Sequence, residues 1–179
     1  LRPLGKSAED YYIKQRDNNE KLEAKKKFYE MKAESDIIQA KEKNNPDDVS
    51  AVNNFNQTFG QYKNQQLSQI KNKRVKRKLE LLLNADQPES VYKIKAASFE
   101  ALEAQNIDMY NTEQNTLSAE YSLSKDPNLK DIAKQKRIES AKEFENMHLM
   151  GKPWLNKEIQ TINTDSAIFD ADVAIANND

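Results

Sequence analysis

Residues 46–84 read PDDVSAVNNFNQTFGQYKNQQLSQIKNKRVKRKLELLLN, and this stretch decides the fold. Its apolar side chains recur at steps of three to five residues, at Val52, Phe55, Phe59, Tyr62, Leu67, Ile70, Val75, Leu79 and Leu82. That spacing places them along one face of an α-helix, because the residues between them are mostly polar. We therefore predict one helix over 46–84, which acts as the central packing element of an all-α protein.

Prolines divide the rest of the chain into further helices. Asn45-Pro46-Asp47, Asp86-Gln87-Pro88 and Asp126-Pro127-Asn128 each combine a capping residue with a proline in the first turn, which is typical of a helix start. Gly151-Lys152-Pro153 ends one helix and begins another. The predicted helices cover residues 8–43, 46–84, 88–124, 127–150 and 153–177. Short links between them indicate an elongated array of long antiparallel helices without a sheet.

The first helix differs from the others because it has little to bury. Between residues 14 and 27 only Leu22 and Ala24 are apolar, so we expect residues 1–45 to form a projecting charged helix. Its one usable seam contains Leu22, Tyr29, Ala33 and Ile37. Residues 46–179 are expected to form a single domain of helical hairpins, as a segment of a larger assembly.

Three residues of that seam are predicted to contact a partner, and Trp154 is a further candidate. Trp154 opens the last helix beside Pro153, where it either anchors the helix against the preceding turn or acts as an interface hot spot. The candidate interface residues are therefore Leu22, Tyr29, Ile37 and Trp154. The expected partners are other protein chains, in a homo-oligomer or a larger symmetric assembly.

The composition excludes several classes of protein. Apolar residues make up 37% of the chain and charged residues 32%, which suits narrow helix seams better than a deep core. The net charge of −1 provides no bulk attraction to nucleic acid or to an anionic membrane. The absence of cysteine excludes disulfides and thiolate metal sites, and no apolar run is long enough to span a membrane. The first residue is Leu1 rather than Met, so we expect the native chain to begin earlier.

One local feature could bind an anion. Six basic residues fall within eight positions, and Val75 and Leu79 between them are expected to turn inward. We favour a solvated helix face, and the alternative is contact with nucleic-acid backbone or an acidic partner. No aromatic residue interrupts the run, so base stacking is not indicated. The six residues are Lys71, Lys73, Arg74, Lys76, Arg77 and Lys78.

Two apparent catalytic motifs are incomplete. Gly5-Lys6-Ser7 lacks the strand and the earlier glycine of a phosphate-binding loop, so Ser7 is expected to cap the first helix. Glu145 and His148 have the spacing of a di-iron ligand pair, but such a site needs two pairs and the chain has one histidine. We expect no catalytic, metal-binding or cofactor-binding residues, and no enzyme activity.

The predicted long polar helices begin at Asn45-Pro46-Asp47 and Asp126-Pro127, and the sequence closes with Ala176-Asn177-Asn178-Asp179. In these features the chain resembles internal virion or ejection proteins of short-tailed bacteriophages. The resemblance implies a non-enzymatic protein inside the phage particle, at or near the portal and tail. Two alternatives stay open: a cytoplasmic helical adaptor or coiled-coil protein, and a helical nucleic-acid-binding module that uses residues 71–78.

Overall fold

The computed structural model describes residues 4–176, and 91% of these residues lie in five α-helices with no strand. The all-α prediction is confirmed. Contacts divide the chain into two units, Leu1–Glu103 (unit 1) and Ala104–Asp179 (unit 2), at a different place from the boundary expected at residue 45. The helices are α1 (Leu4–Lys41), α2 (Asp48–Ser68), α3 (Lys73–Leu123), α4 (Pro127–His148) and α5 (Lys152–Ala176).

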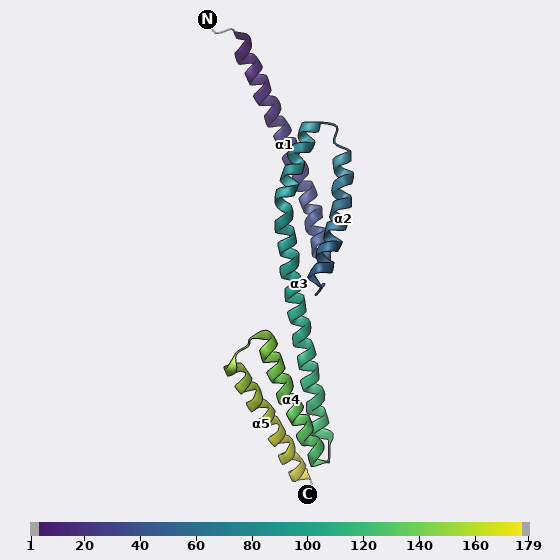
Figure 1. The fold of residues 1–179 in the computed structure, drawn as a ribbon, viewed down its shortest axis with the longest axis vertical. Helices are drawn as coiled ribbons and strands as arrows, with labels where there is room; N and C mark the ends of the chain where they lie inside the picture. The colour runs from purple at the N-terminus through teal and green to yellow at the C-terminus, as the bar shows by residue number, and fades with distance from the viewer. Residues whose placement is uncertain (1–3, 177–179) are drawn as a thin grey trace. The chain divides into compact units, whose positions relative to one another are not determined.

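Unit 1 is a bundle of α1, α2 and the first part of α3 (Figure 1). The α2–α3 pair is antiparallel: Lys63 Nζ donates to Asn84 Oδ1 at 3.0 Å, and Gln87 Nε2 donates to Asn56 Oδ1 at 3.3 Å. The apolar core lies where the three helices meet. Its buried members are Ala24, Met31, Ile38, Ala51, Phe55, Phe59, Leu67, Val75, Leu79, Leu83 and Ile94.

The prediction of one helix over 46–84 is wrong, because the chain turns between Ser68 and Lys73. Asn72 provides the local reason: its Oδ1 accepts hydrogen bonds from the backbone N–H groups of Arg74 and Val75, as an N-cap does. The apolar residues of the stripe are still buried or half-buried, since the turn folds α3 back beside α2.

The predicted helix start at Pro88 is also wrong, because Pro88 lies inside α3. Proline in a helix interior loses one backbone hydrogen bond and strains the preceding turn. Contacts to the other two helices hold this part of α3 in place. Asp86 pairs with Lys32 of α1, and Gln87 bonds Asn56 of α2.

The seam predicted for α1 does not pack within unit 1, and its role as a partner contact stays a prediction. Leu22, Tyr29 and Ile37 are 65%, 66% and 53% exposed. The buried side chains of α1 follow a different line, with steps of three, four or seven residues, and two of them are polar, which hides the pattern in the sequence. They are Glu20, Ala24, Met31, Ser35 and Ile38.

Residues 8–16 of α1 carry no buried side chain. Residues 8–16 are all exposed, whereas burial in unit 1 begins at Glu20. Figure 1 shows this purple part of α1 running past the turn that joins α2 to α3. Among the residues whose side chains are described, 8–16 therefore match the projecting helix expected over 1–45, whereas α1 packs within unit 1 from Glu20 onward. Helix α1 begins at Leu4, so Ser7 is inside the helix rather than at its cap.

Unit 2 is a second three-helix bundle, made of the end of α3 with α4 and α5 (Figure 1). Asp126 caps α4 and Pro127 takes its first turn, as predicted. Leu149, at φ 51°, and Gly151, at φ 84°, adopt left-handed backbone conformations that end α4 before α5 begins. The core contains Tyr110, Ala141, Phe144 and Ile162.

The middle of α3 has no buried side chain. From Phe99 to Met109 every residue is exposed or half-buried, whereas Ser98 belongs to unit 1 and Tyr110 to unit 2 and both are buried. This eleven-residue stretch is therefore a helix without packing support of its own.

Candidate interaction surfaces

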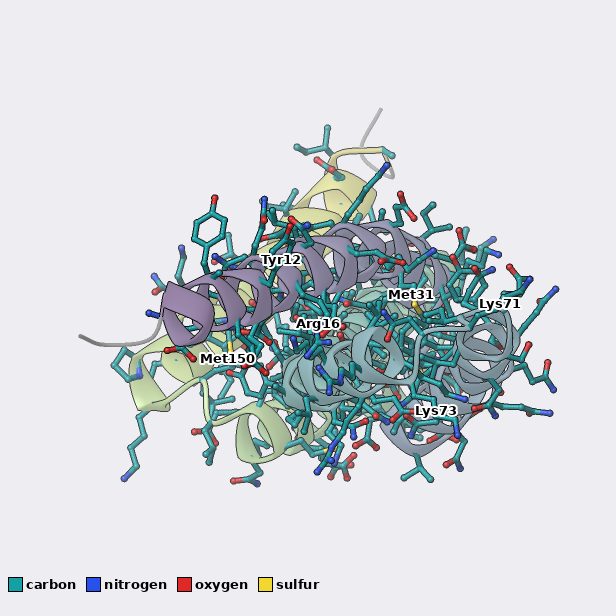
Figure 2. All side chains as sticks on the ribbon, turned by 90° about the horizontal axis from the view of Figure 1, so that it is seen from above. Tyr12, Arg16, Met31, Lys71, Lys73 and Met150 are labelled. Carbon is teal, nitrogen blue, oxygen red and sulfur yellow. The ribbon has the colours of Figure 1, made fainter. Side chains whose placement is uncertain are left out.

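The basic run lies on the α2–α3 turn and the first two turns of α3. Val75 and Leu79 are fully buried, as predicted, whereas Lys71, Lys73, Arg74 and Arg77 are exposed and Lys76 is half-buried. Figure 2 labels Lys71 and Lys73 on this part of the ribbon. Among the described residues, these five cations form no salt bridge. Lys78, the sixth residue of the run, does form salt bridges.

The charges of this surface oppose the local helix dipole. The first turn of α3 contains no acidic residue, although the positive end of a helix dipole favours one. Lys73 and Arg77 are four residues apart and Arg74 and Arg77 are three apart, so like charges also face each other along the helix. An anion bound at this turn would reduce both the unfavourable interaction with the helix dipole and the repulsion between the cations.

Lys78 differs from the rest of the run because it joins α3 to α1. It pairs with Asp17 and, at 3.3 Å, with Glu20. The hydrogen bond to Asp17 raises the pKa of Lys78. Hydrogen bonds from Lys21 and Lys78 lower the pKa of Asp17 to about 2. Lys78 is therefore a structural residue of unit 1, and the sequence offered no sign of this pairing.

The second candidate surface is the outer face of α1, opposite the buried line. Leu22, Tyr29, Ala33 and Ile37 lie there and are exposed, together with Tyr11 near the start of the helix. Figure 2 labels Tyr12 and Arg16 on the same unpacked part of α1. The predicted interface residues of α1 thus remain available to a partner.

Trp154 packs inside unit 2. Its ring centroid lies 6.0 Å from that of Tyr110 and 5.6 Å from that of Phe144, and the side chain is half-buried. This is the anchoring role considered for Trp154. The ring of His148 is tilted by 31° to that of Phe144, with 4.3 Å between the ring centroids, and its Nε2 is buried without a hydrogen-bond partner in the described part of the chain.

A buried arginine links the three helices of unit 2, which the sequence did not suggest. Arg137 of α4 is 6% exposed; its Nε donates to Gln114 Oε1 of α3 at 3.1 Å, and its Nη2 lies 3.2 Å from Asp165 of α5. Gln114 Nε2 in turn donates to the backbone oxygen of Arg137 at 2.9 Å. These contacts indicate that Arg137 stabilises unit 2.

The described part of the surface includes two open hollows. The one between α1 and α3 measures about 290 Å³ and is lined by Ala24, Leu81 and Leu82, with lysine side chains at its rim. That volume is near the lower limit for small-molecule pockets. The other is an open strip along α5 alone, with Gln160, Thr164 and Ala167 among its residues.

The described residues contain neither a metal-binding cluster nor a membrane-spanning helix. Over residues 4–176 no group of three or more His, Asp or Glu residues is placed to hold a metal ion, and Glu145 and His148 remain an isolated pair. In that same range no helix is long and apolar enough to cross a membrane.

The two units carry opposite charge. Residues 1–103 contain 20 Lys and Arg against 16 Asp and Glu, a net charge of +4, and residues 104–179 contain 8 against 13, a net charge of −5. The overall charge of −1 therefore hides the positive charge of unit 1. Unit 1 contains the basic run 71–78, which we call the basic turn.

The comparisons with known proteins identify no relative. No protein-family model matches the chain, and neither the curated proteins nor the solved structures include a significant match.

Proposed function

We propose that this chain is a non-enzymatic structural and interaction protein that works inside a larger protein assembly. The observation that carries the proposal is the exposure of its apolar residues. Among the described residues 22 large apolar side chains are exposed, against 18 buried apolar residues, alanines included. Single exposed apolar residues are ordinary, but an exposed line along one helix face is typical of an interaction site.

Three-helix bundles suit such a role, since they present helix faces to a partner. The resemblance to internal virion proteins makes a bacteriophage particle our first candidate for the assembly, with the chain as an internal, ejection or portal-associated component. A cytoplasmic helical adaptor is the alternative. Both readings need protein partners and neither needs a cofactor.

Purified particles test the virion assignment. We expect the chain to co-sediment with phage particles from its natural source, in a fixed copy number, and to be visible in images of the assembly. Mass spectrometry of density-gradient fractions measures this. A chain that is missing from the particles and occurs as a discrete dimer in the host cytoplasm would support the adaptor instead.

Polyanion binding is a second candidate function, favoured by the exposed cations at the basic turn and by the net charge of unit 1. Replacing Lys73, Arg74, Lys76 and Arg77 by Gln should weaken binding to duplex DNA while α3 stays folded, because Gln is a good helix former. Binding should fall steeply with salt, through counterion release. The matched control replaces four exposed lysines of unit 2, Lys136, Lys142, Lys152 and Lys157, and removes the same charge.

The control decides between a local and a diffuse effect. If only the basic-turn variant loses binding, the turn contacts the polyanion. Equal losses in both variants indicate general electrostatic attraction. If the wild type does not bind DNA at physiological salt, the run is a solvated face.

A further inference from the structure

Helix α1 has two apolar faces, and only one is used within unit 1. The buried line runs through Ala24, Met31 and Ile38, and the outer line through Leu22 and Tyr29 lies on the opposite side. A second helix on the outer line would not meet α2 or α3, since those helices cover the buried side. The outer face is therefore open over residues 8–40.

The outer line follows a heptad pattern over residues 19–33. With Leu22 and Tyr29 at consecutive d positions, Asn19, Lys26 and Ala33 occupy the a positions. Polar residues at a positions weaken a coiled coil but fix its register and oligomeric state. This pattern favours a two-stranded coiled coil with a small apolar interface.

The charges beside the line differ between its two flanks. Lys25 and Lys32 occupy g positions, whereas Glu23 and Glu30 occupy e positions. In a parallel pair of helices, g residues face e residues of the partner, so Lys25 meets Glu30. An antiparallel pair would place Glu against Glu and Lys against Lys. Lys25 and Glu30 are both exposed, and neither forms a salt bridge among the described residues; Lys32 pairs with Asp86.

The start of α1 also needs support. Residues 8–16 are helical although all their side chains are exposed, including Tyr11 at 65% and Tyr12 at 72%. An isolated helical extension of this length is marginal in water. A parallel copy of α1 would cover Tyr12, which occupies an a position in the same heptad frame, and would stabilise these turns.

We propose that two copies of this chain pair through the outer faces of their α1 helices, as a parallel, in-register, two-stranded coiled coil. Leu22 and Tyr29 form its central layers, and Lys25 of each copy pairs with Glu30 of the other. The proposal deepens the proposed function by naming a second copy as the partner of this face. It does not depend on the assembly being a virion.

Cysteine cross-linking tests the geometry directly, because the chain has no cysteine of its own. Lys26→Cys and Ala33→Cys place thiols at successive a positions without removing either tyrosine or the leucine of the line. A parallel in-register pair brings each cysteine beside its copy, so both variants should form disulfide-linked dimers under mild oxidation. The control is Lys95→Cys, an exposed lysine of α3 in the same unit, which should remain largely monomeric.

Each other outcome overturns the proposal. An antiparallel pair links at most one of the two a positions, and random collision links Lys95→Cys as fast as the others. Circular dichroism of every variant confirms that the helices are intact, since all three positions are exposed.

Charge reversal tests the pairing independently. Lys25→Glu and Glu30→Lys should each weaken dimerisation about tenfold in sedimentation experiments, because each replaces two attractive contacts by repulsive ones. The double variant should restore the affinity of the wild type. Failure of that rescue would overturn the Lys25–Glu30 contact. A dimer that behaves as described but is missing from phage particles would refute the virion assignment alone.

Discussion

At the scale of single residues, Asp17 makes the stability of unit 1 sensitive to acid. Its pKa is lowered from 3.8 to about 2 by Lys21 and Lys78, so its contribution is fully present above the ordinary value and is lost as the pH falls towards 2. We expect the wild type to lose more stability than Asp17→Asn between about pH 4 and pH 2. Thermal unfolding at several pH values measures the difference.

Asp36→Asn is the control, because Asp36 is exposed on the same helix and forms no salt bridge among the described residues. It should follow the wild type at every pH. If Asp17→Asn did the same, the interaction of Asp17 with Lys21 and Lys78 would not stabilise the fold.

Replacing Phe59 tests how much α2 contributes to the stability of the core of unit 1. The side chain is 6% exposed and its ring centroid lies 5.5 Å from that of Phe55, so Phe59→Ala leaves a cavity. We expect a loss of about 3–5 kcal/mol in the free energy of unfolding. Phe99→Ala, at a site that is 61% exposed, should change it by less than about 1 kcal/mol. If chemical denaturation gave similar losses of stability for the two variants, Phe59 would not be part of the core.

At the scale of helices, Pro88 gives an unusual opportunity to stabilise α3. Pro88→Ala restores the missing N–H group and removes a steric clash within the helix, so it should raise the stability by about 1–3 kcal/mol. Pro127→Ala, at the first turn of α4, should have little effect, since no helical hydrogen bond is lost there. Denaturant midpoints of the two variants compare these sites. A destabilising Pro88→Ala would show that the proline fits a bend the bundle requires.

The two prolines also show how far the sequence could predict the helices. Asp126-Pro127 and Asp86-Gln87-Pro88 have similar chemistry, and only the first begins a helix. The difference comes from contacts of Asp86 and Gln87 with α1 and α2, which are distant in the sequence. Helix class and most of the buried stripe followed from periodicity, because local spacing determines them.

The faces of α1 could not be assigned in the same way. Its outer line contains Leu22, Tyr29 and Ile37, which are more apolar than Glu20 and Ser35 of the buried line. Periodicity alone therefore selected the exposed face. Glu20 is buried because Lys78 neutralises it, a pairing across 58 residues that no local pattern reveals.

At the scale of the whole molecule, the 22 exposed large apolar side chains among the described residues lead us to expect that the chain associates with a partner. We expect its unfolding temperature to rise with protein concentration, because association stabilises the folded state by mass action. Sedimentation and thermal scans over a wide concentration range measure both effects. A monomer with a sharp transition that does not depend on concentration would contradict this.

The unsupported stretch of α3 from Phe99 to Met109 has a kinetic consequence. A helix segment held only by its own hydrogen bonds opens locally at little cost, so its amide protons should exchange with solvent far faster than those of α3 near Leu79 or Tyr121. The same openings admit a protease. Brief digestion should therefore cut first near Leu102, and would release unit 1 and unit 2 as separate helical fragments.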